Sequence, residues 1–439
     1  MKFDHSTIRE IVTAVQQGAV SCVDIINHFS HRINKTESNI QAWQHYDASV
    51  NQQQATVLDK QQPHGALHGI PVGLKDIFDT TDYPTEYGSQ IYTGHQPATD
   101  STVARKLKEA GAVVMGKTVT TEFAFFNPAK TRHPHNFNYS PGGSSSGSAA
   151  AVAAGHIPVA IGSQTNGSVI RPASFCGVYG FKPSRGLVSR YGVLETSSSF
   201  DHVGVFANHL EDIATVTDAI ATYDPQDNAS YQTPDETLYS GYQKALDIQS
   251  GEQSPSIAWL EMPYRDRYSA DANAAFESFL TSIEGTVSRI EAPAFFSDYL
   301  QAHKVIYDYE IVRALEKEIN QHWDLISETA QPIFTVAQQR TEAAYLEALS
   351  MRESAIQWFD DFFKQHDAIL TPSALSEAPL MGSTGDPVCC TTWTLCGLPC
   401  INLPLLKGSN QLPIGLQLVG AARQDHLLMY HAHQFLRQI

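Results

Sequence analysis

The chain has 439 residues and 42% of them are hydrophobic, so it can bury a sizeable core as one large or two ordinary domains. Lys and Arg number 29 against 46 Asp and Glu, which gives a formal net charge of −17. This excess of acid repels phosphate backbones and anionic lipid, so we expect no nucleic-acid or membrane partner. The acidic side chains are interpreted as a well-solvated surface.

The N-terminal segment is typical of folded structure. A secretory signal would carry a continuous apolar core here, but the first ten residues include the charged Asp4, Arg9 and Glu10. No apolar run reaches the roughly 20 residues that span a bilayer. These features predict a cytoplasmic protein.

The six cysteines are predicted to be free thiols, because no secretory signal directs the chain to an oxidising compartment. They occupy positions 22, 176, 389, 390, 396 and 400. The last four are close enough in sequence to be considered as thiolate ligands, but their segment is apolar and lacks a second Cys-x-x-Cys-type pair. We therefore expect no metal site.

Helices are predicted to fill residues 1–60. Two capping boxes mark helix starts there, one formed by Thr7 and Glu10 and the other by Ser21 and Asp24. Apolar residues recur on one face of the helix that follows the first box.

Strands and helices alternate in the next part of the chain. The apolar residues of 68–77 predict a buried strand that ends near Lys75. A helix over about 101–110 is predicted to lead into a short strand at 112–115.

The remaining elements follow the same alternation. The small residues of 148–154 favour a helix, and 158–162 favours a strand. A polar stretch near 224–236 is predicted at the surface, and most of 237–366 is predicted to be helical. Further strands are predicted at 256–260, 368–372, 400–406 and 413–419.

Helices interspersed with short apolar strands predict an α/β protein. We expect a single α/β/α domain over residues 1–439, in which helices cover a mixed, largely central β-sheet. No segment has the composition of a linker, and the motifs that carry the chemistry fall between about 65 and 200.

Residues 111–118 match the Gly-x-x-x-x-Gly-Lys-Thr pattern of a phosphate-binding loop. Such a loop follows a strand, so that its backbone can curl around phosphates. Here a predicted helix precedes Gly111, and the intervening Ala, Val, Val and Met are typical of the strand itself. Gly111 is therefore interpreted as a helix C-cap, and a nucleotide-binding protein is the disfavoured alternative.

Residues 143–147 match the Gly-x-Ser-x-Gly nucleophile elbow around Ser145. An elbow follows a strand, whereas the residues before this one are polar and turn-like. A flexible Gly/Ser linker is another interpretation, but a helix and a strand are predicted directly after it. The elbow pattern therefore supports Ser145 only weakly.

A longer pattern covers residues 141–183, from PGGSSSGS to GFKP. It resembles the amidase signature, in which a PGGSSGGS-type loop leads through a small-residue helix and a strand to a nucleophilic serine. GIPVGLKD at 69–76 resembles the family's lysine-bearing segment. The likeness continues into CGLPCINLPL and PIGLQLVG near the C-terminus, so it covers most of the chain.

The resemblance implies roles for three side chains. Lys75 matches the general base, Ser144 the bridging serine that follows a cis peptide bond, and Ser168 the acyl-accepting nucleophile. The 24 positions from Ser144 to Ser168 are the spacing of the family. The resemblance also implies an oxyanion hole formed by the backbone amides of Thr165, Asn166, Gly167 and Ser168.

These residue types suit amide hydrolysis. Serine needs an adjacent base to become a nucleophile at neutral pH. Lysine acts as a base only when neutral, so burial must lower its pKa from about 10.4. A hydroxyl between Lys75 and Ser168 can relay the proton to the base and back to the leaving amine, and Gly167 lets amide N–H groups converge on the oxyanion.

Three positions depart from the commonest form of the pattern. Ser146 and Asn166 stand where many members have glycine, and Arg171 lies one position later than in Ile-Arg-x-Pro. The last two departures favour the free-standing amidases over the amidotransferase branch. Arg171 is expected to pair with a carboxylate, either to orient this loop or as an ordinary ion pair. His133 and His135 are interpreted as polar loop residues and not as ligands.

We therefore expect a cofactor-free amidase that hydrolyses a carboxamide C–N bond through a serine acyl-enzyme and releases ammonia or an amine. The expected partner is a small-molecule amide substrate, and the sequence is also compatible with assembly into a homodimer. The alternative within the same fold is a glutaminase, the amide-cleaving component of an amidotransferase, that passes ammonia to a partner protein.

Substrate-binding side chains are expected at Phe126 and Asp386, with Phe125 and Tyr307 as further candidates. Asp386 falls near a position that binds the substrate amine in the glutaminase branch. Each of these residues is equally consistent with the core or with an ordinary loop.

Overall fold

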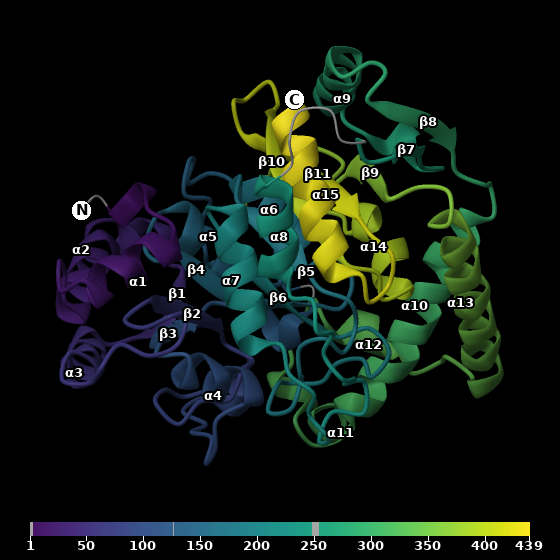
Figure 1. The fold of residues 1–439 in the computed structure, drawn as a ribbon. Coiled ribbons are helices and arrows are strands. Elements are labelled where there is room, and N and C mark those ends of the chain that lie inside the picture. The colour runs from purple at the N-terminus through teal and green to yellow at the C-terminus, as the bar shows by residue number, and fades with distance from the viewer. Residues whose placement is uncertain (1–2, 126, 248–253) are drawn as a thin grey trace.

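The computed structural model describes residues 3–125, 127–247 and 254–439 (Figure 1). The strands are β1 (Trp43–Tyr46), β2 (Pro71–Lys75), β3 (Val113–Thr118), β4 (Val159–Gln164), β5 (Tyr179–Lys182), β6 (His202–Ala207), β7 (Ile257–Glu261), β8 (Val287–Glu291), β9 (Ala368–Pro372), β10 (Cys400–Lys407) and β11 (Pro413–Val419).

The α-helices surround these strands. They are α1 (Ile8–Gln16), α2 (Cys22–Ile40), α3 (Ala48–Leu58), α4 (Thr102–Glu109), α5 (Ser146–Ala153), α6 (Ile170–Cys176), α7 (Leu210–Ile220), α8 (Leu238–Leu246), α9 (Ala270–Ser282), α10 (Phe296–Ala314), α11 (Glu316–Gln321), α12 (Gln331–Ala337), α13 (Glu342–Phe362), α14 (Val388–Leu395) and α15 (Asp425–Gln438).

All the strands join one mixed sheet in the order β1-β3-β2-β4-β6-β5-β10-β11-β9-β7-β8. Strand β2 pairs in parallel with β3 and β4, and β7 pairs in parallel with β8 and β9. The N-terminal strands fill one half of the sheet, and the antiparallel pair of β5 with β10 joins them to the C-terminal strands. The α/β fold with a mixed central sheet is therefore confirmed.

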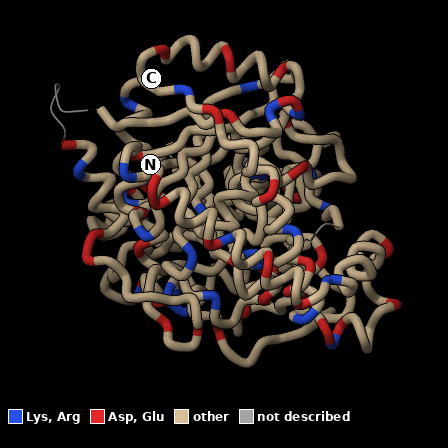
Figure 2. Tube along the Cα trace, turned by 90° about the vertical axis from the view of Figure 1, so that its right-hand side faces the viewer, with Lys and Arg blue, Asp and Glu red and all other residues tan. Residues whose placement is uncertain are grey.

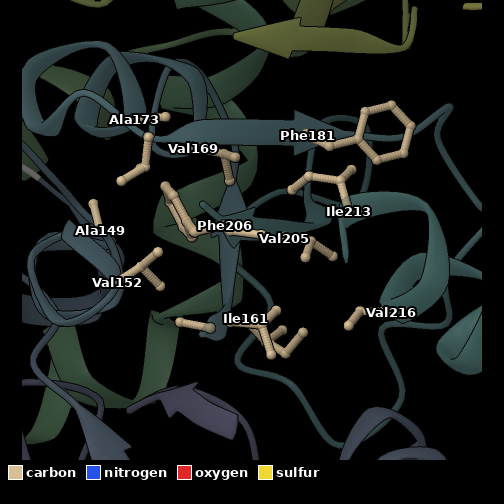
Figure 3. Close-up of a cluster of buried hydrophobic side chains, with 14 of the residues drawn as sticks. Ala149, Val152, Ile161, Val169, Ala173, Phe181, Val205, Phe206, Ile213 and Val216 are labelled. Atoms are coloured by element: carbon tan, nitrogen blue, oxygen red, sulfur yellow. The ribbon is translucent and has the colours of Figure 1, made fainter. Parts of the chain in front are cut away.

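Helices cover both faces of the central strands (Figure 3). Ala149 and Val152 of α5 lie on one side of β4 and β6, whereas Ile213 and Val216 of α7 lie on the other. The alternation of side chains along a strand explains this arrangement, because successive residues point to opposite faces.

Helix α5 packs unusually close to its neighbours, and its small residues make this possible. A Cβ atom added at Gly147 would lie 2.2 Å from the carbonyl oxygen of Ala42 and 2.4 Å from the backbone nitrogen of Val119. The run of alanines that follows is almost entirely buried. This close approach holds the start of α5 against the residue before β1 and the residue after β3.

Several local predictions are confirmed. Both capping boxes form, at the N-termini of α1 and α2. Strands lie at each of the predicted buried segments, and β2 ends at Lys75 as expected. Helix α4 ends before Gly111, which has a φ of +88° and begins the connection to β3.

Other elements differ from the predictions. Strand β1 interrupts the helices expected over residues 1–60, and β8 interrupts those expected over 237–366. Both are edge strands with mostly half-buried or exposed residues, so neither carries the apolar run of a central strand. Strands β5 and β6 are not among the predicted elements either, although they occupy the centre of the sheet.

Acidic and basic positions are interspersed along the trace (Figure 2). Within the described ranges, no helix combines the length and the apolar character needed to cross a bilayer. The six cysteines are buried and unpaired.

Candidate active site

Lys75 is the last residue of β2, and its side chain is fully buried. Its Nζ donates hydrogen bonds to Oγ of Ser144 at 2.7 Å and to Oγ of Ser163 at 2.8 Å. Burial lowers the pKa of Lys75 well below its usual range, whereas the carboxylate of Asp201 acts to raise it. A neutral amine in hydrogen-bond contact with a serine hydroxyl is the form in which lysine can accept a proton.

Ser144 lies in the turn that leads into α5, and the Gly143–Ser144 peptide bond is cis. The backbone N–H of Thr121 donates to the carbonyl oxygen of Ser144 at 3.3 Å. The guanidinium of Arg171 donates from Nη2 to the carbonyl oxygen of Gly143 at 2.7 Å. The turn is thereby tied to the loop after β3 and to helix α6.

Ser168 lies in the short connection between β4 and α6. Gln164, at the end of β4, accepts hydrogen bonds at its side-chain oxygen from the N–H groups of Val169 and Ile170, at 2.8 and 3.0 Å. The same side chain donates to Oγ1 of Thr394 at 3.0 Å. Gln164 therefore fixes the backbone just after Ser168 and links it to helix α14.

The carbonyl groups of this connection have defined partners. The oxygen of Thr165 lies 3.0 Å from Nε2 of His303, and that of Asn166 accepts from Oγ1 of Thr394 at 2.7 Å. The oxygen of Gly167 accepts from the N–H of Arg171 at 3.0 Å. Burial lowers the pKa of His303 to about 4, so its ring is neutral at pH 7 and donates one N–H.

The N–H groups of residues 165–168 differ from these carbonyls. None of the four has an acceptor among the residues that the structure describes. Buried or half-buried amides without partners are rare in folded proteins. Four of them in succession are therefore available to a ligand oxygen.

Asp201 joins the Ser168 loop to the rest of the site. Its carboxylate accepts hydrogen bonds from the side chain of Thr165 and from the backbone and side chain of Thr196. It is also the charged group that acts on the pKa of Lys75. The sequence motifs do not identify Asp201, Ser163 or His303. Asp201 and His303 reach the site from segments that carry no recognisable pattern, and the motifs give Ser163 no role.

A pocket opens at Ser168. Ala124, Phe125, Tyr307 and Pro387 contribute to its walls together with the Ser168 loop, and the pocket is partly open to solvent. The Phe125 and Tyr307 rings make an edge-on contact with centroids 5.6 Å apart. Both candidate residues therefore lie at the pocket.

The two residues predicted to bind substrate are placed differently. Phe126 lies outside the described residues. Asp386 does not line the pocket at Ser168. It is half-exposed, forms an ion pair with Arg267, and accepts from the N–H of Val388 at 2.9 Å.

The residues of the two competing motifs have structural partners. Lys117 of the Gly-x-x-x-x-Gly-Lys-Thr segment is buried in strand β3, in an ion pair with Asp76 at 3.1 Å. Oγ of Ser145 is buried and donates to the carbonyl oxygen of Ser163 at 3.1 Å. A turn, and not a strand, precedes Ser145.

The predicted carboxylate partner of Arg171 is not found. Its guanidinium is buried, bonds to the Gly143 carbonyl, and forms no ion pair with any described residue. Asp386 is the acidic residue whose charge acts on Arg171, but its carboxylate forms an ion pair with Arg267 instead. Among the described residues, no cluster of three His, Cys, Asp or Glu side chains has the arrangement of a metal site.

The buried Lys75 thus contacts Ser144 in the turn before α5 and Ser163 in strand β4. The chain matches the Amidase family over residues 24–429, and it therefore belongs to the amidase-signature family.

Subunits of glutamyl-tRNA(Gln) amidotransferases resemble the chain over nearly its whole length. A glutamyl-tRNA(Gln) amidotransferase subunit of Microcystis aeruginosa is 32% identical, over 98% of this chain and 97% of its own length. The corresponding subunit of Chlamydia pneumoniae is 30% identical, over 97% and 94%.

Among solved structures, a chain of the "unexpected vestigial protein complex" that "reveals the evolutionary origins of an s-triazine catabolic enzyme" has a TM-score of 0.91, 25% identity and 98% coverage of both chains. The native peptide amidase from Stenotrophomonas maltophilia has a TM-score of 0.84 and 26% identity, with 99% of this chain and 97% of that chain covered.

Proposed function

We propose that this protein is a free-standing amidase that hydrolyses carboxamide C–N bonds through a covalent acyl-enzyme. The observation that carries the proposal is the fully buried Lys75, whose Nζ lies 2.7 Å from Oγ of Ser144. In this proposal Lys75 is the general base, Ser144 the proton relay and Ser168 the nucleophile.

Acylation follows from these roles. Neutral Lys75 accepts the proton of the Ser144 hydroxyl while Ser144 accepts that of Ser168, and Oγ of Ser168 attacks the substrate carbonyl carbon. The oxyanion receives hydrogen bonds from the unpaired N–H groups of residues 165–168. The C–N bond then breaks as the proton returns from Lys75 through Ser144 to the leaving nitrogen.

Deacylation uses the same groups. Water attacks the ester at Ser168 and gives a proton through Ser144 to Lys75. The carbon–oxygen bond to Ser168 breaks, the proton returns to Oγ, and a carboxylic acid leaves. No histidine or carboxylate takes part in this scheme.

The alternative is a component of an amidotransferase that transfers ammonia to a partner protein. The identity of 30–32% to glutamyl-tRNA(Gln) amidotransferase subunits favours it, whereas the likeness to a peptide amidase supports the free-standing enzyme. The two functions differ in what the isolated chain does. Release of ammonia from simple amides, without a partner protein or ATP, is the result expected of the free-standing amidase.

The catalytic assignment is tested by removing its members singly and together. Lys75→Ala and Ser168→Ala should each lower turnover by about 10⁴- to 10⁶-fold, and the double variant should lose little more, because a nucleophile without its base is nearly inactive. Ser145→Ala is the matched control and should keep substantial activity. Intact-mass spectra should reveal an acyl adduct in the wild type that Ser168→Ala lacks.

Two outcomes would contradict this catalytic assignment. Multiplicative losses in the double variant would show that Lys75 and Ser168 do not act as a unit. An acyl adduct that persists in Ser168→Ala would place the nucleophile elsewhere.

A further inference from the structure

Asn166 carries a carboxamide two residues before the proposed nucleophile, where many members of the family have glycine. Its φ lies outside the left-handed region, so the backbone conformation gives no reason for an asparagine at this position. The residue is half-buried and lines the pocket at Ser168. The side chain is therefore a feature of the pocket and not a requirement of the turn.

Helix α14 fixes the orientation of this carboxamide. Oγ1 of Thr391, a buried residue of α14, donates to Oδ1 of Asn166 at 2.7 Å. Nδ2 of Asn166 has no acceptor among the residues that the structure describes. A carboxamide nitrogen has two N–H donors, and both are available here to a molecule in the pocket.

The surroundings of Nδ2 make an unsatisfied donor unfavourable once a substrate is bound. Ala124, Phe125, Tyr307 and Pro387 give the pocket a largely apolar wall. A substrate displaces water from this wall, and the donor then lacks a hydrogen bond unless the substrate supplies an acceptor. Sites of this kind discriminate against analogues that lack the partner atom.

The reach of Asn166 limits where the partner atom can lie. Two residues of chain span at most about 7 Å, so Asn166 stays close to the carbonyl group that Ser168 attacks. In the proposed function the backbone N–H groups of residues 165–168 bind the oxyanion, which leaves Nδ2 for a second acceptor. A primary amide releases ammonia, so a second acceptor in such a substrate belongs to its acyl part.

We propose that Nδ2 of Asn166 binds an uncharged oxygen on the acyl part of the substrate. The enzyme then prefers amides whose acyl chain carries a carbonyl or ether oxygen within a few bonds of the scissile carbonyl. This inference rests on the proposed function, in which Ser168 is the nucleophile.

Pairs of neutral amides that differ in one oxygen test this proposal. 3-Methoxypropanamide is compared with pentanamide, and acetoacetamide with 3-methylbutanamide. The ratio of kcat/KM within a pair measures the preference for the oxygen-bearing amide, and its value in Asn166→Ala accounts for intrinsic differences in reactivity. For at least one pair the wild-type ratio should exceed that of Asn166→Ala about tenfold, as expected for one hydrogen bond between neutral groups. Equal ratios in the two proteins for both pairs would overturn the proposal.

Further substitutions separate donation by Nδ2 from support of the loop. Asn166→Asp keeps an oxygen for Thr391 but replaces Nδ2 by oxygen, so the preference should disappear although the contact with α14 remains. Thr391→Val should weaken the preference because Asn166 loses its anchor, whereas Thr391→Ser should retain it. A purely structural role would lower kcat for both amides of a pair by the same factor. A wild-type preference that survives in Asn166→Asp would contradict the proposal.

Binding without turnover gives an independent measurement. In Ser168→Ala, which keeps Asn166, the Tm increase with 3-methoxypropanamide is compared with that caused by pentanamide at the same concentration. The difference should favour 3-methoxypropanamide more strongly than in the double variant Ser168→Ala/Asn166→Ala, and equal differences would overturn the proposal. If the Ser168 adduct forms with the same preference in the wild type and Asn166→Ala, the acceptor inference fails while the proposed function stands. Turnover without any adduct at Ser168 refutes the proposed function itself.

Discussion

Ser163 is the second polar partner of Lys75. Its hydroxyl accepts a hydrogen bond from Nζ, and its backbone N–H and C=O are both bonded to Oγ of Ser145. An acceptor at Nζ stabilises the ammonium form more than the neutral amine. Ser163 thus acts against the burial that lowers the pKa of Lys75.

We expect Ser163→Ala to lower the pKa of Lys75 further. In the proposed mechanism activity rises as Lys75 loses its proton, so the acid limb of the pH–rate profile should move to lower pH. Turnover on the plateau should fall about tenfold, because one hydrogen bond that positions the base is lost. Initial rates measured across pH for the wild type and the variant give both quantities.

Ser148→Ala is the matched control for Ser163→Ala. Its hydroxyl is equally buried and donates to the carbonyl oxygen of Ile161 in the same strand at 3.0 Å, without contacting Lys75. Its acid limb should coincide with that of the wild type. An unchanged limb in Ser163→Ala, or the same displacement in both variants, would argue against a direct effect on the lysine.

At the scale of elements, Asp212 connects two helices. It lies in α7, and its Oδ1 accepts from the N–H of Ile8, the first residue of α1, at 2.7 Å. Its Oδ2 is buried and has no partner among the described residues. Burial raises the pKa of Asp212 from 3.8 to about 8.

This raised pKa makes the contribution of Asp212 to stability depend on pH. Below pH 3.8 the carboxyl group is protonated in both the folded and the unfolded state. Between about pH 4 and 8 only the folded state keeps the proton, so unfolding releases it and stability falls as pH rises. Asn has no such proton but still offers Oδ1 to Ile8.

We therefore expect Asp212→Asn to become progressively more stable relative to the wild type between pH 5 and pH 8. Urea unfolding at pH 5, 6.5 and 8 measures this difference in the free energy of unfolding. Asp24→Asn is the control, because Asp24 is an exposed capping residue whose pKa is lowered, and its effect should be constant over this range. A constant difference for Asp212→Asn would show that its carboxyl group is ionised in the folded state.

At the scale of the whole molecule, the single sheet makes the two halves of the chain depend on each other. The N-terminal strands end at β5, which pairs with β10, and β10 continues through β11 to the C-terminal strands. The candidate site also joins the two halves of the chain, because Oγ1 of Thr394 in α14 donates a hydrogen bond to the carbonyl oxygen of Asn166 in the Ser168 loop.

We expect the chain to unfold in one cooperative transition. Trp43 in β1 and Trp259 in β7 report from opposite halves of the sheet. In protein labelled with 5-fluorotryptophan, the folded ¹⁹F signals of both residues should disappear at the same urea concentration. Loss of the Trp259 signal at lower urea would show that the C-terminal half unfolds as a separate domain.

The sequence by itself determined the features that depend on neighbouring residues. The caps at Thr7 and Ser21, the buried strand that ends at Lys75 and the turn after α4 at Gly111 follow from local hydrogen bonds, apolar runs and backbone freedom. The family resemblance selected Lys75, Ser144 and Ser168 from short motifs of the same kind.

Only the tertiary structure decided which residues surround that site. Ser163, Asp201 and His303 reach it from separate elements, and Arg171 bonds to a backbone carbonyl and not to the expected carboxylate. The edge strands β1 and β8 likewise depend on partners distant in sequence. Contacts between distant segments are set by packing of the whole sheet, and no local pattern records them.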